Sequence, residues 1–172
     1  MKSRGPAPVH LWNPPFCGDI DMRIAKDGTW FHEGKPIQRQ AMVQLFSTIL
    51  LREADEFFLV TPAEKVRIQV EDCPYVITRM EIEGTGEDQN IIFVTNTEEF
   101  VQVDSEHPIE VDNPGEGDEP HPVVLVRNSL WALINRPVFY RLVEAAEEKM
   151  LEGQVHIGVW SGGQYFSLGT IE

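Results

Sequence analysis

The stretch DIDMRIAKDGTWFHEGKPI, residues 19–37, shows how the first part of the chain is built. Apolar residues alternate with polar ones on both sides of Asp27-Gly28, which is the pattern of a half-buried strand on each side of a turn. Asp-Gly is a strong hairpin signal, because a two-residue type I′ turn needs positive φ at both central positions. Glu33-Gly34 can reverse the chain a second time. The stretch therefore predicts an antiparallel hairpin and then a second turn.

A helix is expected next, over residues 39–53, because Met42, Leu45, Phe46 and Ile49 recur at helical spacing. Alternating apolar residues then predict short strands. They are expected near 57–60, 66–71, 75–83, 90–94, 99–103 and 109–111, with one longer strand over 123–134.

The end of the chain predicts one more helix and one more hairpin. Asn135 can cap the helix, Pro137 falls in its first turn, and Gly153 would lie just past its end. The hairpin is expected over 155–169, with its turn at SGGQ. An acidic stretch rich in proline and glycine, residues 104–122, predicts a long mobile loop that carries one short strand.

The order of strands, helix and strands occurs twice, which indicates an internal repeat. With an offset of 97 residues, IQRQAMVQLF at 37–46 and INRPVFYRLV at 134–143 share three identities. We therefore predict an α+β fold of two small similar halves, each a curved, mostly antiparallel sheet packed on one helix. The expected division is an N-terminal arm (1–16), a first subdomain (17–84), and a second subdomain with the acidic loop (85–172).

Charge is distributed unevenly along the 172 residues. The net charge is −14, and residues 85–172 hold 4 basic and 16 acidic side chains, a net of −12. Residues 80–126 contain no Lys or Arg. Such a surface repels phosphate backbones and anionic lipid, so no nucleic-acid or membrane partner is expected. No apolar run is long enough to span a bilayer, and no signal peptide is recognisable, so we expect a cytoplasmic protein.

Three segments carry a family resemblance: CGDIDMRIAKDGTWFHEGKPIQR, LVTPAEK and IQVEDCPYVI. In their order and spacing they resemble the bacterial domain-of-unknown-function family 1285. The resemblance runs from about residue 17 to the C-terminus and is strongest over 17–77. It implies a two-part α+β fold with repeated motifs, and a role in bacterial signal transduction or ligand sensing has been inferred for such folds. The family has no assigned biochemical activity and supplies no catalytic residue to carry over.

Asp19, Asp21 and Trp30 are candidate ligand-binding residues in the opening stretch. In a strand, the two carboxylates point to one face with Cα atoms about 6.5–7 Å apart. They could share a divalent cation or perform acid–base chemistry; the alternative is a solvated face. Trp30 could stack on a planar ligand, or it could fill the core beneath the first helix.

Arg39 and Arg136 occupy matching places near the two predicted helix starts, where the helix dipole disfavours a positive charge. We expect them to face the junction between the halves and there to pair with acids of the opposite half or to hold an anionic ligand. The alternative is that both project into solvent.

Catalytic and metal-binding motifs are not recognisable. There is no G-x-S-x-G elbow and no Rossmann or P-loop spacing. Cys17 and Cys73 lie in no Cys-x-x-Cys, so a tetrahedral zinc site would need histidines brought in by the fold. We therefore predict no catalytic residue, no metal and no cofactor, and a non-enzymatic sensing or protein-interaction module with an unknown protein or small-molecule partner. The alternative is a small-molecule-binding protein or an enzyme that uses the groove between the halves near Asp19 and Asp21.

Overall fold

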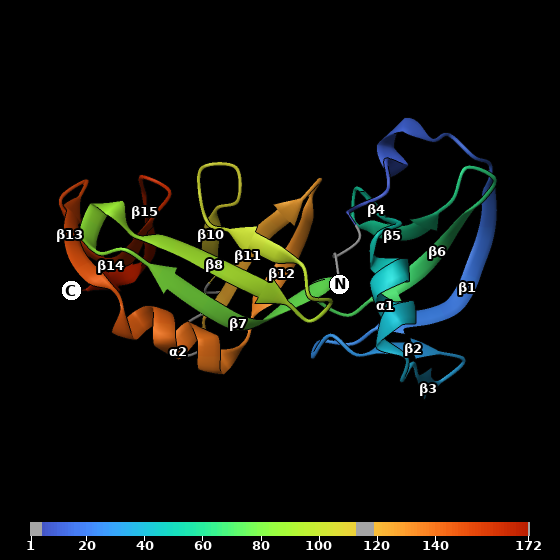
Figure 1. Cartoon of the computed structure of the whole chain (residues 1–172), viewed down its shortest axis with the longest axis horizontal. Helices are drawn as coiled ribbons and strands as arrows, with labels where there is room; N and C mark the ends of the chain where they lie inside the picture. The colour runs from blue at the N-terminus through green and yellow to red at the C-terminus, as the bar shows by residue number, and fades with distance from the viewer. Residues whose placement is uncertain (1–4, 113–118, 172) are drawn as a thin grey trace.

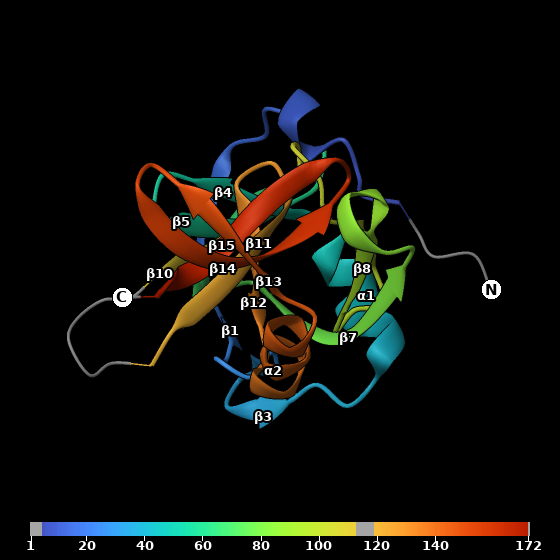
Figure 2. The same cartoon turned by 90° about the vertical axis from the view of Figure 1, so that its left-hand side faces the viewer.

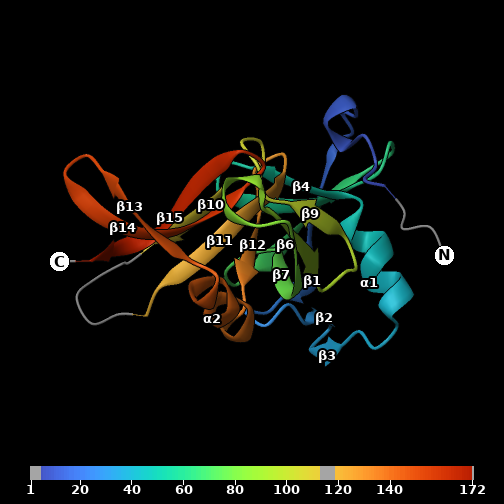
Figure 3. The same cartoon turned by 60° about the vertical axis from the view of Figure 1, so that its left-hand side comes forward.

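The computed structural model describes residues 5–112 and 119–171. Within these ranges, two six-stranded sheets follow each other along the chain, and a three-stranded sheet comes last. The first sheet lies at one end of the molecule and the three-stranded sheet at the other (Figures 1 and 3). In the described part of the chain, no helix is both long and apolar enough to cross a membrane.

The first half, described from residue 5 onward, contains a short 3-10 helix, one α-helix and six strands. In chain order they are η1 (Val9–Leu11), β1 (Phe16–Ile24), β2 (Trp30–His32), β3 (Lys35–Pro36), α1 (Gln40–Ser47), β4 (Leu50–Glu53), β5 (Glu56–Val60) and β6 (Lys65–Val70).

The second half begins at Tyr75, earlier than the boundary at 84/85 that the sequence suggested. Its described elements are β7 (Tyr75–Glu83), η2 (Gly86–Asp88), β8 (Asn90–Thr95), β9 (Phe100–Gln102), β10 (Ile109–Asp112), β11 (His121–Arg127), β12 (Leu130–Ile134), α2 (Arg136–Glu144), β13 (Glu147–Leu151), β14 (Gln154–Ser161) and β15 (Gln164–Ile171). The short strand expected in the acidic stretch is β10. Residues 113–118 of the expected mobile loop lie outside the described residues.

The two six-stranded sheets share one topology. Each consists of two antiparallel three-stranded meanders, and the first and last strands of the sheet, in chain order, pair in parallel at its centre. β1 pairs with β6 in the first sheet, and β7 pairs with β12 in the second. The predicted α+β fold of two similar halves is therefore confirmed. The helices occupy different places, because α1 joins the two meanders of its half whereas α2 follows the last strand of its sheet. The repeat thus lies in the strand order.

The first helix is shorter than predicted. α1 ends at Ser47, and the residues expected to continue it form β4, which pairs antiparallel with β5. Leu50 and Leu51 fit an apolar strand as well as a helical stripe, so pairing with β5 decides between the two. The helix also faces differently: Val43 and Ser47 are its buried residues, whereas Leu45 is exposed.

Two predicted features of the second half are wrong. The run 123–134 is a hairpin rather than one strand, because Asn128 and Ser129 reverse the chain between β11 and β12 with φ of 44° and 65°. Neither residue is a glycine, so Asn128-Ser129 is only a weak turn signal. Gly153 does not cap α2. The helix ends at Glu144, and Gly153 lies in the turn between β13 and β14.

The turns of the opening stretch are present, with one change. Gly28 has φ 90°, as predicted, but Asp27 does not have positive φ, so this is not a two-residue type I′ turn. The Ala25 N–H donates instead to the Thr29 carbonyl and closes a three-residue loop. The Asp27 carboxylate accepts a hydrogen bond from the Thr29 N–H, which lowers the pKa of Asp27. The second turn forms as expected, since both of its residues have positive φ.

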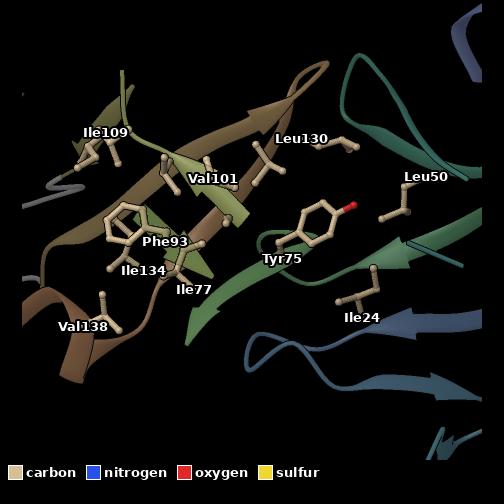
Figure 4. Close-up of a cluster of buried hydrophobic side chains, with 14 of the residues drawn as sticks. Ile24, Leu50, Tyr75, Ile77, Phe93, Val101, Ile109, Leu130, Ile134 and Val138 are labelled. Carbon is tan, nitrogen blue, oxygen red and sulfur yellow. The ribbon is translucent and has the colours of Figure 1, made fainter. Parts of the chain in front are cut away.

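One hydrophobic core runs through both halves. Figure 4 shows Tyr75 between Ile24 and Leu50 of the first half and Ile77 and Phe93 of the second. All five side chains are buried. The halves therefore share an interface, as expected for a chain too short to build two large separate cores.

The C-terminal sheet docks on the second sheet through a buried serine. The Ser161 hydroxyl donates to the Val103 carbonyl at 2.6 Å and accepts from the Ile91 N–H at 2.8 Å. β14 also lies against β8, and β15 against β10. The end-on view of Figure 2 shows β13–β15 in front of the second sheet, with α2 below them.

Candidate functional site

A cavity of about 340 Å³ lies between α1 and the first sheet. Most of its wall is apolar and comes from α1 and from strands β1, β5 and β6; Ile20 and Phe46 are examples. The polar members are His32, Thr61 and Glu64. His32 and Glu64 are exposed, whereas most of the apolar lining is partly or fully buried, so these two polar side chains lie towards the mouth of the cavity. Cavities of this size and composition are typical small-molecule sites.

The cavity-lining helix is tied to the second half at both of its ends. At the first turn, the Gln40 side-chain amide donates to the Asn96 carbonyl at 2.8 Å. At the last turn, the Ser47 carbonyl accepts hydrogen bonds from the second half. Met42 and Phe46, on another face of the same two turns, line the cavity. A shift of α1 caused by filling the cavity would therefore disturb contacts with the second half.

The contacts at Ser47 belong to a network centred on the partly buried Arg127. The Arg127 guanidinium donates to the Ser47 carbonyl at 3.0 Å, to the Tyr75 hydroxyl at 2.8 Å and to the Glu99 carboxylate at 2.5 Å. The Tyr75 hydroxyl donates to the same carbonyl at 3.0 Å. Burial opposes the charge of Arg127, but Tyr75 and Glu99 outweigh it and raise its pKa, so the guanidinium stays charged. Burial raises the pKa of Tyr75 to about 12.

A second hollow, a groove of about 460 Å³, lies at the junction of the halves. Asp72 and Cys73, from the connection between β6 and β7, meet His121 at the start of β11. His121 Nε2 lies 2.9 Å from each carboxylate oxygen of Asp72, and Cys73 Sγ lies 3.7 Å from Asp72 Oδ1. Burial, together with Asp72, raises the pKa of the Cys73 thiol to about 12.

Asp19 and Asp21 line neither hollow. Both are exposed on the outer face of β1, while Ile20 between them lines the α1 cavity from the inner face. Asp19 pairs with Arg67 at 2.5 Å, and this hydrogen bond lowers the pKa of Asp19. Trp30 is buried and stacks on Phe46 of α1, with ring centroids 6.1 Å apart. It is a core residue beneath the helix, not an open platform.

Arg39 and Arg136 do not make the expected junction. Arg39 is exposed at the N-cap of α1, and its side chain does not cap the helix. Arg136 pairs with Glu119, an acid of its own half, and both side chains are mostly exposed. α2 lies away from the first half (Figure 1), and the ion pair of Arg136 is made within its own half. Arg127, which donates to the Ser47 carbonyl at 3.0 Å, and Arg52, which donates to the Ser129 carbonyl at 3.1 Å, bridge the two halves.

Sequence reasoning missed Asp72, His121 and Arg127 as site residues, and it left Cys73 without a partner. No local signal marks them. Asp72 and His121 are 49 positions apart, and Arg127 reaches across 80 positions to Ser47. Only the pairing of β7 with β12, and of β11 with β12, brings these groups to the junction.

Comparison with known proteins covers nearly the whole chain. Residues 7–73 match the family "Domain of unknown function (DUF1285), N-terminal domain", and residues 74–168 match "Protein of unknown function (DUF1285), C-terminal domain". A DUF1285 family protein from Silicibacter pomeroyi DSS-3, known from a crystal structure, shares 51% sequence identity with this chain. The two structures superimpose with a TM-score of 0.90 over 99% of this chain and 91% of that chain. A DUF1285 family protein from Shewanella baltica OS155 is 26% identical, with a TM-score of 0.57, over 72% and 91% respectively. No curated protein matches.

Proposed function

This chain belongs to the DUF1285 family, and we propose that it is a non-enzymatic sensing module whose first half binds a small apolar molecule beneath α1. The observation that carries the proposal is the double role of α1. The helix lines the cavity with Met42 and Phe46, and it holds the second half through Gln40 and Ser47.

The lining indicates the class of ligand. The apolar interior favours a hydrocarbon or aromatic body, which gains free energy as it leaves water. The Glu64 carboxylate and the Thr61 hydroxyl at the mouth favour a hydrogen-bond donor, such as an amine or a hydroxyl, on the outer end of the ligand. The Thr61 hydroxyl already accepts from the Glu64 N–H at 3.1 Å, which leaves the carboxylate as the stronger acceptor.

The output would be a change at the junction of the halves. A ligand that prefers a displaced α1 shifts the population towards that state, and the Ser47 carbonyl then leaves Tyr75 and Arg127. A bacterial signalling role, in which the second half reports occupancy to a partner, fits such a change. Arg127 favours the assembled state, because its guanidinium, held in place by Glu99 and Tyr75 of its own half, donates to the Ser47 carbonyl only there.

The test is a titration of the full chain with octylamine, octanol and octanoate, followed by NMR. We expect octylamine to bind most tightly and octanoate least, because Glu64 lies at the mouth. Amide signals of α1 and of Asn96 in the second half should shift together. Binding that shifts only first-half signals would contradict sensing, and the absence of binding by all three probes would contradict the cavity assignment.

A matched pair of variants locates the binding. Met42→Trp should block the cavity and weaken octylamine binding by about tenfold or more, because the larger side chain occupies the ligand's space. Leu45→Trp places the same side chain on an exposed part of the same helix, outside the cavity wall, and should bind as the wild type does. Equal weakening by both variants would place the ligand elsewhere.

A further inference from the structure

We propose that Asp72, Cys73 and His121 bind one zinc ion in the groove between the two halves. The three side chains supply a carboxylate oxygen, a sulfur and an imidazole nitrogen, all within 4.8 Å of one another. The site is separate from the cavity under α1, because none of these residues lines that cavity. The zinc proposal therefore stands or falls independently of the proposed function.

The spacing of the three ligand atoms fits a tetrahedral ion. Bonds of about 2.0 Å to nitrogen and oxygen and about 2.3 Å to sulfur place N and O about 3.3 Å apart, and S and O about 3.5 Å apart. The observed separations are 2.9 Å between His121 Nε2 and Asp72 Oδ1, and 3.7 Å between Cys73 Sγ and Asp72 Oδ1. The three ligand atoms all lie within 4.8 Å of one another, so side-chain rotations that shorten the longest separation by up to about 1.3 Å would admit the ion.

The surroundings favour a metal over a plain ion pair. On the other nitrogen of His121, the Asp112 carboxylate lies 3.9 Å from Nδ1. This is the side on which an outer carboxylate orients a metal-binding histidine. Sulfur with nitrogen and oxygen selects zinc over magnesium or calcium, which prefer oxygen alone. Three protein ligands also leave a fourth position for a water molecule.

A zinc ion here would link the halves. Asp72 and Cys73 belong to the connection that leaves the first sheet, and His121 opens a strand of the second. An ion that binds only the folded arrangement stabilises it by mass action. The expected effect is an increase in the melting temperature that grows with zinc concentration.

The experiment uses the full chain carrying Cys17→Ser, which removes the exposed thiol, after treatment with a chelator. Zinc titration by calorimetry should give one ion per chain. Cobalt should give the thiolate-to-cobalt charge-transfer band and the visible bands of a tetrahedral ion. Absence of stoichiometric zinc binding, or a cobalt spectrum without the thiolate band, would overturn the proposal.

Ligand variants and a matched control complete the test. Cys73→Ser should remove the thiolate band, and His121→Gln should weaken zinc binding by about tenfold or more. His121 is partly exposed, so its variant should fold even if the change at buried Cys73 disturbs the protein. His107→Gln is the control, because His107 also contacts an aspartate of the second half, Asp104, at 2.9 Å. Among the residues that the structure describes, His107 belongs to no cluster of three metal-binding side chains. The control variant should bind zinc as the parent does; equal loss in both histidine variants would refute the site.

Discussion

Replacing Arg127 by alanine should destabilise the fold far more than replacing a typical paired arginine. The Arg127 side chain is 16% exposed and its partner Glu99 is 30% exposed. Truncation leaves the Glu99 carboxylate without its counter-ion, and it also removes the hydrogen bonds to Tyr75 and to the Ser47 carbonyl. Breaking a buried pair by removing one partner costs about 3–5 kcal/mol. Because Glu99 regains some water, we expect about 3 kcal/mol here.

Arg79 provides the matched control. It pairs with Glu98 at the same 2.5 Å as the Arg127–Glu99 contact, but the two side chains are 60% and 52% exposed. Such a pair contributes about 0–1 kcal/mol. Arg79→Ala should therefore change the free energy of unfolding by less than about 1 kcal/mol. The comparison holds residue type and contact distance constant and varies burial.

The assay is urea unfolding of the wild type and both variants, followed by tryptophan fluorescence and far-ultraviolet circular dichroism. High salt adds a second criterion, because it screens an exposed pair much more than a buried one. The difference between Arg127→Ala and the wild type should persist in high salt. The reasoning is refuted if Arg127→Ala loses no more stability than Arg79→Ala, or if salt removes the difference.

Two further predictions concern the turn after β1 and the alkaline limit of stability. Gly28→Ala should lower the free energy of unfolding by about 2–3 kcal/mol in thermal unfolding, because φ is 90° and the new Cβ would lie 2.7 Å from the Asn96 side chain. Gly34→Ala, at φ 80° in open space, should lower it by only about 1 kcal/mol. Equal losses in the two variants would remove the steric argument. Burial raises the pKa of Tyr75 from 10.0 to about 12, so its neutral phenol stabilises the fold below pH 10 and this contribution is lost as pH rises to 12. Between pH 9 and pH 12, the free energy of unfolding of the wild type should fall by about 2–3 kcal/mol more than that of Tyr75→Phe, as measured by urea unfolding. An equal fall in both proteins would contradict this prediction.

Local signals predicted the features that local chemistry controls. Alternation located most strands, because one buried face imposes a period of two wherever a sheet covers a core. Asn135 was recognisable as a cap, and its side chain does accept from the Val138 N–H at 3.0 Å. The positive φ of Gly28 followed from its place after Asp27. Each of these depends on residues only a few positions apart.

The errors arose where distant segments decide the outcome. Residues 50–53 could form helix or strand, and pairing with β5 made them strand. Arg39 and Arg136 stood out in the sequence because the helix dipole is a local property, whereas the burial of Arg127 depends on β11 lying beside the last turn of α1. The proposed zinc ligands carry no local signal for the same reason, since Cys73 meets His121 only when the second sheet is formed.

The strength of the Arg127 network limits what the first half can sense. A ligand shifts an equilibrium only by its difference in affinity for the two states. Two hydrogen bonds hold the Ser47 carbonyl, one from the neutral Tyr75 hydroxyl and one from the Arg127 guanidinium, and together they contribute about 3 kcal/mol. A ligand must therefore bind the displaced state about 150-fold more tightly to balance them. Ligands that merely fill the cavity beneath an unmoved helix would bind without effect on the second half. The charged junction at Ser47 would then act as a threshold, and it would make the response depend on ligand shape against Met42 and Phe46 as well as on affinity.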